Sequence, residues 1–275
     1  MKEQIKNILG NILISLQPKK AAELSANGMT LIVNDKLTLQ ERLMRNAILK
    51  KTEENQDFDT LAEFHRNYWV NQGTEYFSLT DDNFETVFLP DCAFIFELLQ
   101  DQLENGTQQP HTLIEIGTGN GDILNYLGEK LSQIDKLIGI DLSPDQTKIN
   151  QNKFKDNSRL EFVASDGFEW VNKHGTANMI FVTSRGVLEY FTQERLLAFF
   201  NKLNSLENTI FVAIEPNGLE HDFSINPDSQ PYGNERSFSH NYPKLFTKAG
   251  FKLWHQSRKA YPDNDHYLSF IGARN

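Results

Sequence analysis

The sequence predicts an α/β protein in which a mostly parallel sheet follows a helical N-terminal region. Short apolar runs of strand type alternate with helical patterns from residue 109 onward, which is typical of a parallel sheet buried on both faces. A glycine-rich turn follows the first of these runs. The last two runs are separated too briefly for a crossover helix, so the final strand must run antiparallel. We therefore expect two regions, 1–108 and 109–275.

The N-terminal region shows mainly helical periodicity. Its expected helices are one built on Ile5, Ile8, Ile12 and Leu16, one that Thr38 and Glu41 open as a capping box, one over 58–73 that Gly73 ends, and one that Pro90 opens and Asn105 ends. Residues 31–35 could form a short strand. We expect this region to cover a binding site as a lid, or to form the interface of a homodimer.

Seven strands are expected in the second region. They cover residues 112–116, 136–141, 160–164, 178–183, 209–214, 251–257 and 266–273. Ser143 with Pro144 opens one of the intervening helices, and Thr192 opens another. A long polar loop is expected over 215–239.

The composition is that of an acidic globular protein. The net charge is −10 and the sequence pI is about 5.2, whereas nucleic-acid-binding surfaces are basic, so no nucleic-acid partner is expected. No apolar run is long enough to span a membrane, which would need roughly 18 residues or more. The single cysteine, Cys92, lies in an apolar run and can form no intrachain disulfide. No Cys/His cluster has zinc spacing, so we expect no metal ion. A single cysteine fits a reducing compartment, so we expect a cytoplasmic location.

The most informative segment is the glycine-rich turn. Gly117, Gly119 and Gly121 alternate directly after a strand and before a helix. Glycine lets the backbone approach a ligand closely, and the free N–H groups at a helix start favour a polar or anionic group. The spacing is G-x-G-x-G, whereas dinucleotide sites have G-x-G-x-x-G. By itself, the turn could also be a tight connection between strand and helix.

Two acidic residues follow the next two strands. Asp141 ends the second strand about 20 residues after the glycines, where a carboxylate can accept both ribose hydroxyls of an adenosyl ligand. Ser143 is expected to cap the following helix, which leaves Asp141 free for this role. Asp166 follows the third strand and could accept from an adenine amino group or cap a helix. NAD-dependent enzymes also carry an acidic residue at the position of Asp141. Asp141 therefore indicates that the ligand contains a ribose, but it does not show that the ligand contains a methionine part.

The segments EIGTGNG, IGIDLSP and ASDGF, with KAGF and the two terminal strands, resemble the class I S-adenosylmethionine-dependent methyltransferases over about Thr112 to Asn275. The resemblance implies a Rossmann-like seven-stranded sheet in the order 3-2-1-4-5-7-6, with strand seven antiparallel. It implies S-adenosyl-L-methionine as cofactor, with Asp141 on the ribose and Asp166 on the adenine. The implied cofactor-binding residues are Glu115, Gly117, Thr118, Gly119, Gly121, Asp141, Leu142, Asp166, Gly167, Phe168 and Ser184.

The fourth strand ends in Ser184 and Arg185, which in this family face the transferred methyl group. The N/D-P-P-Y/W motif of base- and amide-methylating enzymes and the Asp of magnesium-dependent catechol enzymes do not occur there. Arg185 could bind an acidic group of the acceptor or form a surface salt bridge. We expect His240, with His221 second, to be a general base, unless His240 caps the next helix. The expected acceptor-binding residues are Tyr68, Trp69, Arg185, Tyr190, Arg236 and Tyr242.

The sequence thus predicts methyl transfer from S-adenosylmethionine to a small-molecule acceptor, with the oxygen of a hydroxyl or carboxyl group as the expected target. One alternative is a protein that binds this cofactor without methylating, for example a cyclase, because fold does not fix function. Another is an NAD(P)-dependent oxidoreductase. The G-x-G-x-G spacing and the antiparallel terminal pair disfavour the oxidoreductase.

Overall fold

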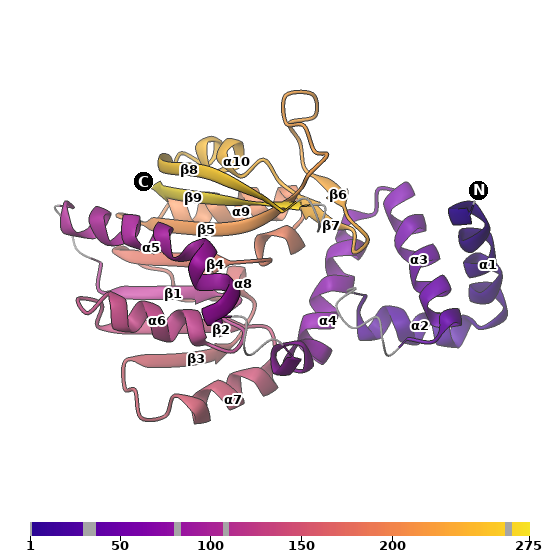
Figure 1. Cartoon of the computed structure of the whole chain (residues 1–275), viewed down its shortest axis with the longest axis horizontal. Coiled ribbons are helices and arrows are strands. Elements are labelled where there is room, and N and C mark those ends of the chain that lie inside the picture. Colours follow the sequence, from indigo (N-terminus) through magenta and orange to yellow (C-terminus); the bar gives the residue numbers. More distant parts are fainter. Residues whose placement is uncertain (1, 30–36, 80–83, 107–109, 262–265) are drawn as a thin grey trace.

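The computed structural model of the chain describes residues 2–29, 37–79, 84–106, 110–261 and 266–275 (Figure 1). A sheet with helices on both faces forms one part of the molecule, and the helices α1 to α4 extend from one side of it. The strand suggested for 31–35 lies outside the described residues. Within the described ranges, no helix is long and apolar enough to cross a membrane.

The main sheet has seven strands in the order β3-β2-β1-β4-β5-β9-β8. They are β1 (Thr112–Ile116), β2 (Lys136–Asp141), β3 (Leu160–Ala164), β4 (Met179–Ser184), β5 (Ile210–Gly218), β8 (Lys252–Tyr261) and β9 (His266–Arg274). Strands β1 to β5 pair in parallel, and β9 runs antiparallel to both of its neighbours. Counted within this sheet, the order is 3-2-1-4-5-7-6 with strand seven antiparallel, so the predicted fold class is confirmed.

Apolar side chains cover both faces of the sheet because successive strand residues point to opposite sides. In β1, Ile114 and Ile116 belong to one core and Leu113 to the other. The first core is covered by the helices α8 (Gly167–His174), α9 (Gln193–Asn204) and α10 (Tyr242–Lys248). The second core is covered by α5 (Leu89–Glu104) and α6 (Asp122–Lys130). Phe154, directly after α7 (Pro144–Lys153), also packs against the second core. Ligand sites of such a sheet lie at the strand ends and not on its faces.

Four helices precede the sheet. They are α1 (Lys2–Leu16), α2 (Pro18–Asn27), α3 (Leu39–Glu54) and α4 (Phe58–Leu79). The predicted capping box is confirmed, since Thr38 Oγ1 accepts from the Glu41 N–H and the Glu41 carboxylate accepts from the Thr38 N–H at 2.8 Å. The prediction that Gly73 ends a helix is wrong, because α4 continues past it. A Cβ atom on Gly73 would come within 3.1 Å of the Trp69 ring, so the glycine makes room for that ring.

The N-terminal helix is confirmed, but its regularly spaced apolar residues face outward. Their exposed fractions are 51% for Ile5, 59% for Ile8, 48% for Ile12 and 72% for Leu16. Helix α1 packs on α3 through another face, where a Cβ atom on Gly10 would lie 2.3 Å from the Leu43 carbonyl oxygen. Exposed apolar surface of this kind is compatible with association. The homodimer stays a prediction.

Helix α5 packs with the sheet although it precedes the expected region boundary. Pro90 stands in its first turn, as predicted. Its buried side chains, among them Phe96 and Leu99, share a core with β1 and α6. A division into 1–108 and 109–275 therefore separates α5 from the residues that it packs against.

The segment after β5 contains a hairpin, so the prediction of one long loop over 215–239 is wrong. Strand β5 continues to Gly218 because it pairs with β9 along its whole length. Strands β6 (Gln230–Tyr232) and β7 (Ser237–Ser239) then pair antiparallel. This hairpin lies between the sheet and the N-terminal helices (Figure 1), and β7 contacts α4.

Candidate active site

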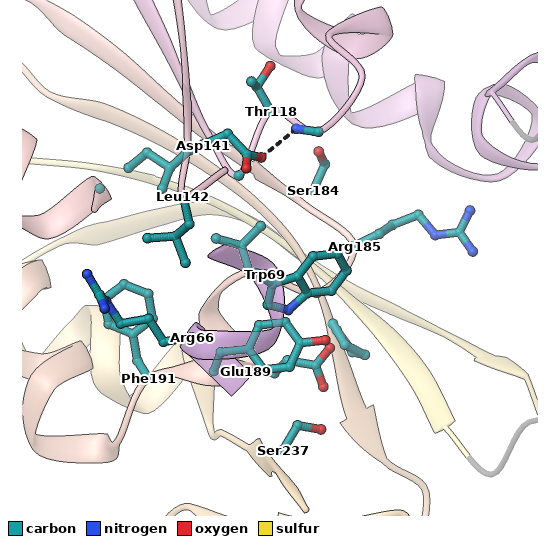
Figure 2. A pocket seen from close by; sticks show the side chains of 18 of the residues that line it. Arg66, Trp69, Thr118, Asp141, Leu142, Ser184, Arg185, Glu189, Phe191 and Ser237 are labelled. Atoms are coloured by element: carbon teal, nitrogen blue, oxygen red, sulfur yellow. Dashed lines mark hydrogen bonds between the residues drawn. The ribbon is translucent and has the colours of Figure 1, made fainter. Parts of the chain in front are cut away.

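A cavity of about 800 Å³ lies between the carboxyl ends of the parallel strands, α4 and the β6–β7 hairpin (Figure 2). Open α/β sheets bind their ligands at this edge. The predicted site residues that line the cavity are Trp69, Gly117, Thr118, Gly119, Asp141, Leu142, Asp166, Gly167, Ser184, Arg185 and Tyr190. The predicted site residues that do not line it are Tyr68, Glu115, Gly121, Phe168, His221, Arg236, His240 and Tyr242.

The turn after β1 presents its backbone to the cavity. Gly117, Gly119 and Gly121 have φ angles of +71°, +52° and +81°. Gly119 lies against Phe77 of α4, and a Cβ atom on it would be 2.6 Å from Phe77 Cε1. Only glycine combines this left-handed backbone with so close an approach. The predicted turn is therefore present, directly before α6.

Asp141 at the end of β2 is anchored to the glycine turn. One carboxylate oxygen accepts from the Gly119 N–H at 3.0 Å and the other from the Ser143 N–H at 2.9 Å. Burial raises the pKa of Asp141 to about 6, although these N–H groups act in the opposite direction. Ser143 caps α7, as predicted. Because each carboxylate oxygen has further acceptor capacity, Asp141 can still accept hydroxyl groups from a ligand in the cavity.

Glu115 is buried behind the turn and does not line the cavity. The hydroxyl groups of Thr118 and Ser184 donate to its two carboxylate oxygens at 2.7 and 3.0 Å. Burial raises the pKa of Glu115 to about 8. Because Thr118 and Ser184 do line the cavity, Glu115 acts by tying the glycine turn to the end of β4.

Asp166 caps α8 and pairs with Arg195. Its carboxylate accepts from the N–H groups of Phe168 and Glu169 at 3.0 and 3.1 Å, and Arg195 Nη2 lies 2.8 Å from both of its oxygens. The helix cap, one of the two expected roles, is therefore observed. The Phe168 ring does not reach the cavity, because it lies against the Arg195 guanidinium.

Aromatic side chains of α4 close one side of the cavity. The Trp69 ring contacts the rings of Tyr76, Phe77 and Tyr190 at centroid distances of 5.5 to 5.8 Å. The Thr74 hydroxyl lies 3.0 Å from the hydroxyl of Ser143, the residue that caps α7. These contacts hold α4 over the strand ends.

The chain turns sharply after β4. Arg185 has a φ of +57°, which residues other than glycine rarely adopt, and Gly186 has a φ of +98°. Figure 2 shows the Arg185 side chain extending away from Trp69 and Glu189. Arg185 therefore borders the cavity, as predicted, while its guanidinium points away from the part near Trp69.

The turn leads into the short 3₁₀ helix η3 (Leu188–Tyr190). The N–H groups of Val187 and Leu188 donate to the fully buried Glu215 carboxylate at 3.0 and 3.1 Å. Burial raises the pKa of Glu215 to about 8. Glu215 thereby fixes the direction of η3, whose other two residues line the cavity.

Two carboxyl groups line the cavity that the sequence reasoning did not single out. Glu189 is 7% exposed, and one of its carboxylate oxygens accepts from the Tyr232 hydroxyl at 2.6 Å. Glu235 lies in the turn of the β6–β7 hairpin. Burial raises the pKa of both groups, and the charge of Glu189 raises that of Glu235 further. Glu189 directly precedes Tyr190, which the sequence predicted as a site residue, and this neighbouring position could have indicated a role for Glu189.

The two histidines predicted as general bases lie away from the cavity, so this expectation is corrected. His240 is fully buried, its Nδ1 lies 2.6 Å from Ser229 Oγ, and burial lowers its pKa to about 3. The ring nitrogens of His221 lie 2.9 Å from Ser239 Oγ and from the Asn226 carbonyl oxygen. The unpredicted hairpin is the reason, because His240 directly follows β7 and enters the core beside it.

Three predicted acceptor-binding residues also lie elsewhere. Tyr242 is fully buried, with its hydroxyl 3.5 Å from the Pro216 carbonyl oxygen. Arg236 pairs with Glu53 at 2.8 Å. Tyr68 is 2% exposed and does not line the cavity. Neighbouring residues on a helix point to different sides, so Trp69 faces the cavity and Tyr68 does not.

The open parallel sheet, the glycine turn and the carboxylate after the next strand form a strand-end site at the topological switch point, where α/β sheets of this kind bind ligands. Residues 113–207 match the family model described as a methyltransferase domain. This match agrees with the predicted resemblance to the class I S-adenosylmethionine-dependent methyltransferases over this part of the chain. The predictions of a methyltransferase enzyme with S-adenosylmethionine as cofactor agree with this match.

Solved structures share the fold of the sheet. The geranyl diphosphate C-methyltransferase from Streptomyces coelicolor A3(2), solved with Mg²⁺, geranyl diphosphate and S-adenosyl-L-homocysteine, aligns with a TM-score of 0.50 and 12% identity over 66% of this chain and 78% of its own. The cyclopropane synthase MmaA2 from Mycobacterium tuberculosis aligns with a TM-score of 0.50 and 14% identity over 66% and 84%. A search of the curated proteins found no match.

Replacing His240 by alanine is expected to destabilise the fold by about 2–4 kcal/mol, because it opens a cavity and removes the buried partner of Ser229. Turnover per folded molecule should fall by much less than the roughly 100-fold that removal of a general base causes. Urea denaturation measures the first effect, and initial rates normalised to folded protein measure the second. A large loss of turnover at unchanged stability would restore His240 as the base.

The protein is expected to lose stability as the pH rises from 6.5 to 8.5. Burial raises the folded-state pKa of Glu115 and Glu215 to about 8, above the ordinary value of 4.5. Their stabilising contribution is therefore complete below about pH 4.5, declines as the pH rises, and is lost by about pH 8. The lowered pKa values of His65 and His240 act in the opposite direction, but only below about pH 6.5. The melting temperature should therefore fall by about 5 °C or more.

Thermal melts at pH 6.5 and 8.5, at matched ionic strength, measure this change. Glu215→Gln removes one of the buried carboxyl groups that titrate in this range and should reduce the difference between the two melting temperatures. Equal melting temperatures at both pH values, in the unmodified protein, would show that the buried carboxyl groups ionise without cost.

Proposed function

We propose that the protein transfers a methyl group from S-adenosyl-L-methionine to a small molecule bound in the cavity. The observation that carries the proposal is the joint placement of Gly119 and Asp141. The carboxylate holds the turn through the Gly119 N–H, and both residues line the cavity. When bound, S-adenosylmethionine supplies an electrophilic methyl group on a sulfonium.

The residues at the strand ends fit an adenosyl ligand. Asp141 would accept the ribose hydroxyls, since both of its oxygens are fixed by backbone N–H groups. Thr118 and Gly119 would contact the amino acid part, at the point where the turn opens onto the cavity. Leu142 and Gly167 would contact the adenine. Alignment and exclusion of water are what the protein contributes to such a transfer.

The acceptor would lie between η3, α4 and the β6–β7 hairpin. Trp69, Tyr190 and Tyr232 line this part of the cavity together with Glu189 and Glu235. A buried carboxylate with a raised pKa is suited to take a proton near neutral pH. Glu189 and Glu235 would therefore have the role that the sequence suggested for a histidine.

Oxygen methylation, the target expected from the sequence, would use such a carboxylate to deprotonate a hydroxyl group. The same carboxylate would deprotonate an amine. The two histidines suggested as bases for an oxygen target, His240 and His221, do not line the cavity. Oxygen methylation is therefore one of two forms of the proposal, and the charge of the cavity favours the other.

The proposal is tested by incubating the purified protein with S-adenosylmethionine and pools of small hydroxyl, carboxyl and amine compounds. We expect S-adenosylhomocysteine to form only with some pools, and Asp141→Ala to abolish its formation. Binding of S-adenosylmethionine with no product from any pool would favour a non-methylating protein on this fold. Failure to bind it would contradict the proposal itself.

A further inference from the structure

The acceptor part of the cavity carries two carboxyl groups that form no ion pair with a Lys or Arg that lines it. Glu189 accepts a hydrogen bond from the Tyr232 hydroxyl, which is neutral. Among the described residues, the ion pairs of the nearby arginines join Arg195 to Asp166 and Arg236 to Glu53, and neither includes Glu189 or Glu235. Arg45 attracts Glu235 electrostatically but does not line the cavity. A buried carboxylate left without a counter-charge is costly, and a positively charged ligand would remove that cost.

Aromatic rings surround the same space. Trp69 contacts Tyr76 at a centroid distance of 5.5 Å and Tyr190 at 5.8 Å, and all three line the cavity with Tyr232. The faces of such rings attract cations, Trp and Tyr most strongly. Carboxylates and rings in one cavity therefore favour the same kind of ligand, by two different interactions.

The arginines at the cavity do not reverse this balance. The Arg185 side chain extends away from Trp69 and Glu189 in Figure 2. Arg195 is paired with Asp166 on the other side of the site. Arg66 is exposed on α4. An anionic acceptor near Trp69 would therefore gain no opposite charge there, and it would raise the pKa of Glu189 and Glu235 further, whereas a cationic ligand would favour their ionised form.

We propose that the methyl acceptor is a cationic amine, whose ammonium group binds between Glu189, Glu235 and the rings of Trp69 and Tyr190. This inference rests on the proposed function, because it assigns the substrate class of the same cavity. It names a chemical class, a primary or secondary amine on a small apolar body.

The chemistry of this assignment balances. The ammonium group gives one proton to the Glu189 carboxylate, or to that of Glu235, and becomes a neutral amine with a free electron pair. That pair forms the new N–C bond to the methyl carbon, while the C–S bond breaks and its electrons go to sulfur. The sulfonium charge passes to the product as a methylated ammonium, which can leave with its charge or give its proton to water.

The test measures binding by calorimetry in the presence of S-adenosylhomocysteine. The probes are phenethylamine and tryptamine, each beside the matching alcohol and carboxylate, 2-phenylethanol with phenylacetate and tryptophol with indole-3-acetate. We expect the amine to bind more tightly than its counterparts by about 10- to 100-fold in at least one set, as a charge-assisted contact allows. No preference for the amine in either set overturns the inference.

Two variants assign the preference to the carboxylates. Glu189→Gln and Glu235→Gln keep the shape and remove the charge, and we expect each to reduce the amine preference by about 10-fold, since a hydrogen bond between charged groups is lost. Glu169→Gln is the matched control, because Glu169 is exposed on α8 and does not line the cavity. A preference that survives both cavity substitutions contradicts the inference.

Product analysis separates this inference from the proposed function. Methylated amines from the reaction with S-adenosylmethionine support both. Methylated alcohols or acids, with no methylated amine, support the methyltransferase and overturn the amine assignment. Absence of S-adenosylhomocysteine binding would reject the methyltransferase before any acceptor is considered.

Discussion

Asp141→Ala is expected to weaken the binding of S-adenosylhomocysteine by about 100-fold or more. Two charge-assisted hydrogen bonds to the ribose would be lost, each worth about 1.5–3 kcal/mol. The substitution also leaves the N–H groups of Gly119 and Ser143 without their acceptor, so the turn that faces the ligand is less well fixed. Isothermal titration calorimetry measures the change.

A matched control distinguishes this effect from a general one. Asp145 lies four residues further on, is exposed, and pairs with Lys148 at the surface. Asp145→Ala should therefore leave the affinity unchanged. Circular dichroism of both variants shows whether they fold. An Asp141→Ala protein that is folded and binds within about threefold of the unmodified chain, a difference of less than 1 kcal/mol, would mean that the ribose is held elsewhere.

Gly119→Ala is expected to lower the same affinity by about 10-fold or more. At φ +52° a side chain costs roughly 1–2 kcal/mol of backbone strain. The added Cβ atom would also lie 2.6 Å from the Phe77 ring, so α4 or the turn must shift at the cavity wall. The shift changes the backbone that is proposed to contact the amino acid part of the cofactor. Calorimetric titration with S-adenosylhomocysteine tests this.

The chain offers a control with the same strain and no contact. Gly233 has a φ of +63°, and a Cβ atom there would meet no other atom within 4 Å. It lines the cavity beside Tyr232, on the proposed acceptor side and not at the glycine turn. Gly233→Ala should therefore lose a similar amount of stability in thermal melts while retaining cofactor affinity. If both variants lost affinity equally, the effect would come from backbone strain and the contact with Phe77 would have no part in it.

The sheet could be predicted from the sequence because its information is local. Each strand of the parallel part is a short apolar run, and caps such as Thr38, Ser143 and Thr192 mark helix starts within a few residues. The glycine turn and Asp141 are equally local, since each follows directly from the end of one strand. These elements supply the cofactor side of the cavity.

The acceptor side could not be predicted in the same way. Its residues depend on how the β6–β7 hairpin and α4 fold back over the strand ends, which no local pattern specifies. The hairpin brings Glu235 to the cavity and carries His240 into the core. On α4, periodicity predicts a helix but does not indicate that Trp69 faces the cavity while Tyr68 is buried.

The central claim is that the glycine turn and Asp141 bind an adenosyl cofactor. Titration of the unmodified protein with S-adenosylhomocysteine, and separately with NAD, tests it most directly. We predict saturable binding of S-adenosylhomocysteine with a stoichiometry of about one per chain, and no binding heat with NAD, because the turn has the spacing G-x-G-x-G. Binding of NAD without binding of S-adenosylhomocysteine would contradict the account.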